Sequence, residues 1–358
     1  MDNIDLSIIV PVFNVEGYLK RALDSILMQS SPIKYEILLI DDDSADQSGA
    51  ICDEYQDNYS NIFVRHIENN GVSEARNLGI SLSRGKYLYF MDSDDFLSDD
   101  FFEKICPNLN GEWDVLCFGY NEIKETNNTI LSCRSHSYQH LGLLKKEEFR
   151  NDFIELFKTD MMYNVWSRIY NKEFILKNNI KFPSKPIGED TLFNFQVYQQ
   201  LDNILFIDST LYNYIAGRSG SALTSYHPKR IEFQLDELQE LHKLLEQFQL
   251  EDATLMQDIK TKIIISSVFQ ISNLKLKRQE KIELLQSIIS NKAFDNIFSG
   301  NGDQIIGPYN MLLRQRNISS FLRRLSIDLL TQKKFRTVIF IEKMKMNPIL
   351  RKIAFKKN

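Results

Sequence analysis

A cluster of carboxylates directly follows an apolar run in the first third of the chain. The run is Tyr87–Phe90, and Asp92, Asp94 and Asp95 come just after it. Residues two positions apart on an extended backbone project to the same side, so Asp92 and Asp94 aim two carboxylates at one point. Such oxygen pairs suit Mg²⁺ or Mn²⁺, above all when a diphosphate completes the coordination shell. An isolated Asp-x-Asp is more often a solvated turn, so the preceding residues must decide between the two.

The residues before this cluster alternate apolar runs with helical patterns. The runs are continuous, as expected of strands buried on both faces, and the segments between them place apolar residues at helical spacing. This alternation favours right-handed crossovers and a mainly parallel sheet flanked by helices. In chain order the predicted elements are strand Leu6–Val12, helix Tyr18–Gln29, strand Tyr35–Ile40, a helix from about Ser44 or Asp46 to Tyr59, strand Ile62–Ile67, helix Val72–Leu82 and strand Tyr87–Phe90.

Polar groups also stand at the carboxyl ends of the other predicted strands, where ligands of such sheets bind. Asn14 and Glu16 follow the first strand, the acidic string Asp41–Ser44 follows the second, and Arg76 lies early in the third helix. Crowded carboxylates repel one another unless a cation joins them, and few basic residues accompany these. The sequence therefore predicts a divalent cation, Mn²⁺ or Mg²⁺, at this edge of the sheet.

Several strings stand in a fixed order on these elements. They are SIIVPVFN at Ser7–Asn14, IDDDS at Ile40–Ser44, NGVSEARNLG at Asn70–Gly79 and FMDSDD at Phe90–Asp95. Each is weak alone, but together, at this spacing, they resemble the bacterial family 2 glycosyltransferases that build surface polysaccharides. The resemblance extends from Leu6 to about Phe102. It implies a GT-A fold and transfer of a sugar, with inversion, from a nucleotide diphosphate donor that is usually UDP.

The resemblance assigns the ends of the first two strands to the uracil ring. Pro11, Val12 and Phe13 would line the slot for the ring. Asp42 would accept a hydrogen bond from the uracil N3–H.

The string after the second strand departs from the family at one position. Asp43 stands where the family usually has glycine, and aspartate tolerates left-handed backbone better than most residues. The alternative role of this string is to cap the next helix. We expect Asp43 or Ser44 to cap while Asp42 binds.

The resemblance also implies how the diphosphate is held. Arg76 would meet the nucleotide as a planar cation, with a surface position on the helix as the alternative. Asp94 would ligate the metal that bridges the phosphates, and Asp92 would face the ribose or a metal-bound water. Other residues assigned to the nucleotide sugar are Asn14, Glu16, Ser93, Arg218 and Ser221, the last two on a loop that would close over the diphosphate or simply stay exposed; His227 is a further candidate metal ligand, although a lone histidine is more often structural.

The middle of the chain is predicted to supply the catalytic base and the acceptor site. The string GEDTLF at Gly188–Phe193 resembles the Gly-Glu-Asp motif of many bacterial members. Direct displacement requires a base opposite the leaving UDP, and we expect Asp190 to be that base. Glu189 would orient the acceptor or pair with a cation, unless both acids only cap the helix that starts there. Trp166 is a candidate sugar platform or, equally, a core residue.

Beyond about Tyr226 the pattern is helical and carries no catalytic string. We expect an all-helical appendage that packs on the catalytic domain or forms a homodimer with a second copy. The predicted domains are 1–226 (nucleotide-binding half 1–102, acceptor-binding half 103–226), a helical domain 227–331 and a basic amphipathic tail 332–358. Predicted helices are Pro228–Leu250, Ala253–Leu276, Glu280–Ser290, Asp303–Gln315 and Ser319–Leu330.

The tail alternates basic and apolar residues at helical spacing. Such a helix can lie on an anionic membrane surface, each cation contributing about 1 kcal/mol. The alternatives are a solvated tail or a helix docked on the protein.

Composition excludes several classes of function. The net charge of −5 argues against nucleic acid as a partner, and four cysteines without a Cys-x-x-Cys pair favour a reducing, cytoplasmic location. No secretory signal or apolar run of about 20 residues is evident. The Gln-x-x-Arg-Trp string of processive synthases is also missing. Together with the resemblance, which implies a UDP-sugar donor and a free or lipid-linked saccharide acceptor, these observations predict a non-processive enzyme that is peripheral on the inner face of the membrane. The alternatives are a catalytically idle scaffold and, more weakly, a sugar nucleotidyltransferase, which would need a glycine-rich loop after the first strand.

Overall fold

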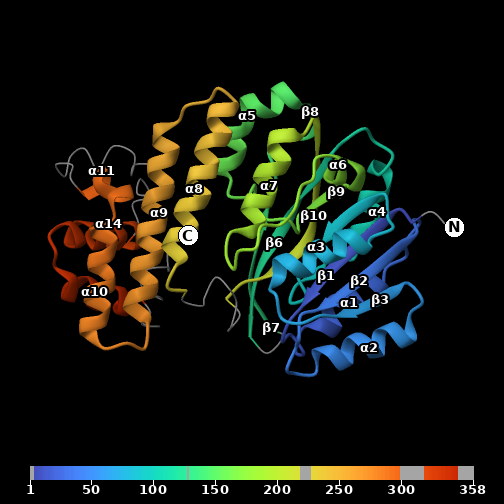
Figure 1. Cartoon of the computed structure of the whole chain (residues 1–358), viewed down its shortest axis with the longest axis horizontal. Helices are drawn as coiled ribbons and strands as arrows, with labels where there is room; N and C mark the ends of the chain where they lie inside the picture. Colours follow the sequence, from blue (N-terminus) through green and yellow to red (C-terminus); the bar gives the residue numbers. More distant parts are fainter. Residues whose placement is uncertain (1–3, 127–128, 218–226, 299–317, 346–358) are drawn as a thin grey trace. The chain divides into compact units, whose positions relative to one another are not determined.

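The computed structural model describes residues 4–126, 129–217, 227–298 and 318–345. The chain divides into two compact units, Met1–Arg218 and Ser219–Asn358. The first unit contains the sheet and the second is helical (Figure 1). The boundary predicted at 226 and the predicted helix at 303–315 lie outside the described residues.

Ten strands form one sheet in the first unit. They are β1 Leu6–Val12, β2 Tyr35–Asp41, β3 Ile62–His66, β4 Tyr87–Phe90, β5 Phe96–Leu97, β6 Val115–Thr126, β7 Thr129–His136, β8 Gly142–Lys145, β9 Arg168–Asn171 and β10 Asn203–Ile215. The order is β3-β2-β1-β4-β9-β6-β10-β5, with β7 beside β6 and β8 beside β10. The first four of these are parallel, as predicted. Strand β9 runs antiparallel between β4 and β6, so the complete sheet is mixed.

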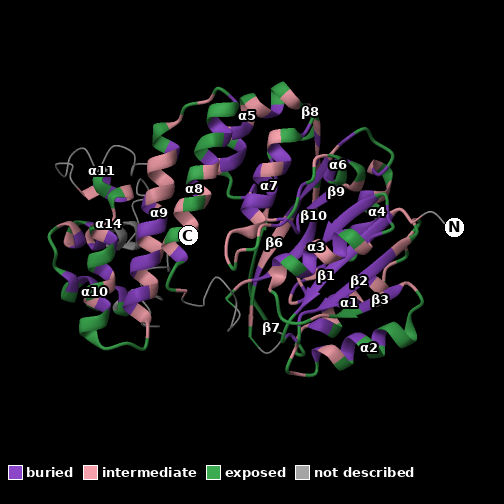
Figure 2. Cartoon of the chain, in the orientation of Figure 1, coloured by how far each residue is buried: buried purple, intermediate pink, exposed green. Residues whose placement is uncertain are grey.

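Helices cover both faces of the parallel part of the sheet. Their bounds are α1 Leu19–Leu27, α2 Ser48–Asn58, α3 Val72–Leu82, α4 Phe101–Ile105, α5 Lys146–Lys158, α6 Lys172–Lys177 and α7 Glu189–Gln200. Strand β1 is buried along its whole length, because α1 and α2 pack on one face and α3 on the other (Figure 2). Gly79 allows α3 to approach closely, since a Cβ there would lie 2.3 Å from Cγ2 of Ile9.

Aromatic packing fixes the start of α7 beside the sheet. The ring centroid of Phe193 lies 4.0 Å from that of Phe182 and 5.7 Å from that of Phe90. Leu192, Phe193 and Val197 are buried and form the inner face of this helix. The first turn of α7, which contains Glu189 and Asp190, is thereby held in place.

The second unit buries its own apolar core. Its longer helices are α8 Arg230–Gln247, α9 Ala253–Asn273, α10 Arg278–Ile289, α14 Ile318–Thr331 and α15 Phe335–Lys345, with the short α11 Asp295–Phe298 between α10 and α14. Side chains from α9, α10, α14 and α15 share one cluster. None of the helices within the described ranges is long and apolar enough to cross a membrane.

The first half of the predicted tail is a helix docked inside this unit. Phe335, Val338 and Ile339 of α15 are buried in the shared cluster. Glu342 is also buried and accepts a hydrogen bond from the Ser326 hydroxyl at 2.6 Å. These three apolar side chains are therefore not available to a bilayer, and this face of the helix takes the docked alternative. Phe340 of the same helix is 62% exposed, and attachment to a membrane stays a prediction. Residues 346–358 lie outside the described residues.

Candidate active site

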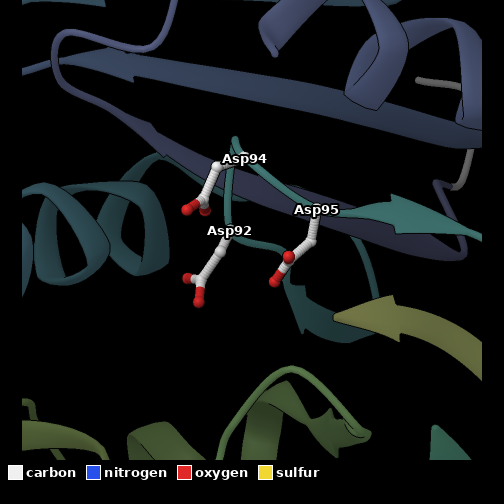
Figure 3. Close-up of side chains that lie close together, drawn as sticks. All are labelled: Asp92, Asp94 and Asp95. Atoms are coloured by element: carbon white, nitrogen blue, oxygen red, sulfur yellow. The ribbon is translucent and has the colours of Figure 1, made fainter. Parts of the chain in front are cut away.

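Three aspartates gather on the loop between β4 and β5, which we call the carboxylate loop. Asp92, Asp94 and Asp95 each offer an oxygen, and these oxygens lie within 4.8 Å of one another. Figure 3 shows the three side chains on the same side of the loop. Asp92 and Asp94 are partly exposed, whereas Asp95 is 1% exposed. A set of hard oxygen ligands open to a diphosphate fits Mg²⁺ or Mn²⁺.

Asp95 is bound to strand β10. Its Oδ2 accepts a hydrogen bond from the Tyr212 hydroxyl at 2.7 Å, and its Oδ1 accepts one from the Ile215 N–H at 2.7 Å. Burial raises the pKa of Asp95, and the neighbouring charges of Asp94 and Asp92 raise it further, against these hydrogen bonds. A cation at this cluster would relieve that repulsion.

Arg76 connects this loop to the first turn of α7. Its Nη2 donates to Asp92 Oδ1 at 2.8 Å, while its Nη1 donates to Asp190 Oδ1 at 2.6 Å and to Glu189 Oε1 at 3.1 Å. The side chain is 3% exposed. Burial opposes its charge, but Asp190, Asp92 and Glu189 together raise the pKa of Arg76. The predicted pairing of Glu189 with a cation is present in the structure.

Three carboxylates share this single guanidinium. Burial raises the pKa of Asp190; Arg76 opposes the shift, and the charges of Glu189 and Asp92 add to it. The side chain of Asp190 keeps 22% exposure, so solvent or a substrate can reach it. A carboxylate with a raised pKa and an open side is suited to accept a proton. Neither Glu189 nor Asp190 caps the helix, because the N-cap position is Gly188 in left-handed conformation.

Asp42 holds the turn that starts α3. Its two carboxylate oxygens accept hydrogen bonds from the N–H groups of Asn70, at 2.8 Å, and Gly71, at 2.9 Å. Asp42 is 4% exposed, whereas the Phe13 ring at the end of β1 is 48% exposed. Pro11 and Val12 are buried beside it. An open aromatic face next to a carboxylate is compatible with a uracil slot, and this assignment stays a prediction.

The loop before α2 is held from the other side. Asn14 Oδ1 accepts from the Ala45 N–H at 2.8 Å, and Glu16 Oε2 accepts from the Gln47 N–H at 2.9 Å. Both residues thus position the segment that follows Asp42. Their contact with the nucleotide sugar stays a prediction.

The backbone of this loop confirms one prediction and corrects another. Asp43 has a φ of 62°, as expected for the position that is usually glycine. The prediction that Asp43 or Ser44 caps α2 is wrong. The helix begins at Ser48, and its N-cap is Gln47, without a side-chain cap.

Trp166 belongs to the core, which was the alternative stated from the sequence. It is 8% exposed, and its ring stacks on Tyr212 at 4.5 Å and on Tyr214 at 5.7 Å. Little of the ring is left for a sugar. Its contact with Tyr212 connects it to the carboxylate loop instead.

The remaining predicted residues contribute less to this geometry. Ser93 is buried between Asp92 and Asp94. His227 lies in the second unit, where its Nδ1 accepts from the Lys229 N–H and its ring packs on Phe233. Its role as a metal ligand stays a prediction. Arg218 and Ser221 lie outside the described residues.

The structure adds Tyr212 to the site, a residue to which the sequence assigned no role. Tyr212 and Asp95 are 117 positions apart and meet only because β5 pairs with β10. The strand pattern around Tyr212 carries no signal for this contact, so only the fold reveals it.

Comparisons with known proteins agree with this arrangement. The model of the family described as "Glycosyl transferase family 2" matches residues 7–175. A relative in Bacillus subtilis, the uncharacterized glycosyltransferase EpsJ, is 28% identical over 62% of this chain and 64% of its own. The glycosyltransferase GlyA of Streptococcus pneumoniae is 29% identical over 67% of this chain and 34% of its own. Less than two thirds of either relative is therefore matched.

A solved structure shares the fold over nearly the whole chain. The crystal structure of S. aureus TarS 1–349 in complex with UDP-GlcNAc has a TM-score of 0.54 and 18% identity, covering 99% of this chain and 93% of that one. Residues 7–175 thus match the model of glycosyl transferase family 2, and the fold of the first unit is GT-A.

Proposed function

We propose that this chain is an inverting, metal-dependent, non-processive glycosyltransferase that moves one sugar per visit from a UDP-sugar to a saccharide acceptor in surface polysaccharide synthesis. The acceptor is free or lipid-linked. Support comes from one observation above all, the ion-pair cluster in which Arg76 bonds both Asp92 and Asp190. It brings a candidate metal ligand and a candidate base to opposite sides of one guanidinium.

The cation-binding end is the carboxylate loop. Asp94 would ligate Mn²⁺ or Mg²⁺, with Asp92 reaching it through water. The ion would supply Lewis-acid stabilisation of the charge that develops on the departing UDP. Asp95, whose two oxygens already accept hydrogen bonds, would support the loop.

The proton-accepting end is the first turn of α7. Asp190 would take the proton of the acceptor hydroxyl as that oxygen attacks the anomeric carbon. Arg76 is buried and bonded to carboxylates, so its role would be to set the separation of Asp92 and Asp190. Glu189 would share this cation and lie beside the incoming acceptor.

The donor assignment rests on the slot at the end of β1. Phe13 offers an exposed ring face, and Asp42 lies at the end of the neighbouring strand. UDP-GlcNAc is the ligand in the structural relative TarS.

A donor panel tests the proposal. UDP release from a series of UDP-sugars, with and without Mn²⁺, should show turnover for one sugar and only with metal. Asp94→Asn should abolish metal-dependent donor binding measured by calorimetry, while Asp99→Asn, an exposed acid nearby, should bind like the wild type. Donor binding without any turnover would favour the idle scaffold, and equal binding by Asp94→Asn would remove the metal role.

Attachment to an anionic membrane at the cytoplasmic face is a separate part of the proposal. This part rests on the sequence of residues 346–358, where basic residues alternate with apolar ones. The basic residues are Arg351, Lys352, Lys356 and Lys357. Removing residues 346–358 should release the protein from anionic vesicles in a sedimentation assay. Equal partitioning of both forms would contradict it. A homodimer through the C-terminal helices stays a prediction.

A further inference from the structure

The hydroxyl of Tyr212 bridges two points of the carboxylate loop. It accepts a hydrogen bond from the Asp92 N–H at 3.3 Å and donates one to Asp95 Oδ2 at 2.7 Å. Tyr212 is fully buried, so water does not compete for these bonds. One phenol therefore fixes the backbone at the first aspartate of the loop and the side chain at the last.

The loop needs such a support because it joins distant strands. Strand β4, before the loop, pairs with β1, while β5, after it, pairs with β10. Three strands, β9, β6 and β10, lie between β4 and β5 in the sheet order. The Ile215 N–H adds a second attachment of Asp95 to β10, at 2.7 Å.

The ring of Tyr212 is itself held from the side. It stacks on Trp166 with centroids 4.5 Å apart and planes 14° apart. This contact limits rotation of the phenol, so the hydroxyl stays aimed at the loop. Trp166 therefore acts on the loop through Tyr212 and not through a substrate.

We propose that Tyr212 is a positioning residue that sets the geometry of the cation site, and that Asp95 is the anchor through which it acts. The inference rests on the proposed metal-dependent function. Ligands held from outside the coordination shell lose about 10–100-fold in metal affinity when that support is removed. Asp94 and Asp92 would remain present in a Tyr212 variant, but their oxygens would no longer be fixed relative to each other.

The test compares two buried tyrosines, one whose hydroxyl makes hydrogen bonds and one whose hydroxyl makes none among the described residues. Tyr212→Phe keeps the stacked ring and removes the bridging hydroxyl. Tyr89→Phe removes another fully buried hydroxyl, one that has no hydrogen-bond partner in the described part of the chain. Mn²⁺ is titrated into each protein, with and without UDP, and the free ion is followed by electron paramagnetic resonance. Melting curves accompany each titration.

We expect Tyr212→Phe to bind Mn²⁺ about 10–100-fold more weakly and Tyr89→Phe to match the wild type. Affinity for UDP without metal should be the same in all three proteins, which a general loss of structure would not allow. If both variants bound Mn²⁺ as tightly as the wild type, the inference would be overturned and the proposed function would stand. A wild-type protein that binds no Mn²⁺ would overturn both.

A second variant covers the case in which Tyr212→Phe does not fold. Trp166→Phe keeps both hydrogen bonds of the tyrosine and weakens only the stack that aims it. We expect a smaller loss, about threefold, because the bonds remain. Unchanged Mn²⁺ affinity in that variant would count against the positioning role.

Discussion

Two arginines are buried among the described residues of the first unit, and their partners differ in kind. Arg76, on α3, is surrounded by the carboxylates of Asp92, Glu189 and Asp190. Arg168, at the start of β9, has no carboxylate partner among the described residues. Its guanidinium donates instead to the Met161 and Asn164 carbonyls, the Asn164 side chain and the Tyr138 hydroxyl.

The difference separates the proposed reactive site around Arg76 from a structural role for Arg168. Three carboxylates around Arg76 leave an excess of negative charge, which favours a cation nearby. Burial raises the pKa of Asp190, and the charges of Glu189 and Asp92 add to that shift against the opposing charge of Arg76. Around Arg168 the partners are dipoles, so the side chain only orders the backbone from Met161 to Ser167. Buried charge alone therefore does not identify a site; the sign and number of its partners do.

The largest expected effect concerns Asp190. Asp190→Asn should lower the rate of sugar transfer about 10²–10⁴-fold, because the acceptor hydroxyl loses its base, while UDP affinity stays unchanged. Asp202→Asn, beyond the end of the same helix and 76% exposed, is the matched control. Single-turnover transfer and calorimetry measure the two quantities. An active Asp190→Asn enzyme would refute the assignment.

The pH profile of the wild type checks the same residue. A base works only when ionised, so transfer should fall as the pH drops through the raised pKa of Asp190. The acid limb of kcat/KM should therefore lie above the ordinary aspartate value of 3.8. Residual transfer by Asp190→Asn should lack this limb. A limb that persists in the variant would point to another group.

Substitution by lysine should affect stability at Arg168 and activity at Arg76. Lysine keeps the charge but not the planar fork. Arg168→Lys should lower the free energy of unfolding by about 2–3 kcal/mol, because buried carbonyls lose partners, with little change in kcat. Arg76→Lys should lower kcat/KM about 10–100-fold, or about 1.4–2.7 kcal/mol, because one ammonium cannot fix both Asp92 and Asp190.

Tryptophan fluorescence is a suitable probe of that stability. The two tryptophans of the chain, Trp113 and Trp166, both belong to the first unit, so urea titrations report its unfolding alone. Arg150→Lys, a partly exposed arginine paired with Glu147, should shift stability by less than about 0.5 kcal/mol. If Arg76→Lys unfolded as readily as Arg168→Lys and kept its kcat/KM, the distinction between site and scaffold would fail.

Local patterns predicted the elements well where burial is simple. The bounds of β1, α3 and β4 agree with the structure, because each is a run whose apolar residues match one period. The left-handed turn at Asp43 also followed from residue type. The start of α2 did not, because Asn14 and Glu16, on another element, hold the residues before it.

Long-range packing explains the other differences. Trp166 had equal claims to the core and to a sugar, and the stack with Tyr212 and Tyr214 decided for the core. Phe335, Val338 and Ile339 of α15 suited a membrane surface, but they are buried in a cluster shared with α9 and α14. In both cases an apolar side chain could pack either in the protein core or against an outside partner. The local sequence does not decide between these two.

The sequence by itself determined the family resemblance, the parallel strands and the identities of the acids at their ends, because strand periodicity and turn chemistry act over a few residues. Only the tertiary structure decided which of these acids share the guanidinium of Arg76. Arg76 meets Glu189 and Asp190 across more than a hundred positions of chain. Tyr212 reaches the carboxylate loop across a similar span. Such contacts depend on strand order in the sheet, which local pattern does not encode.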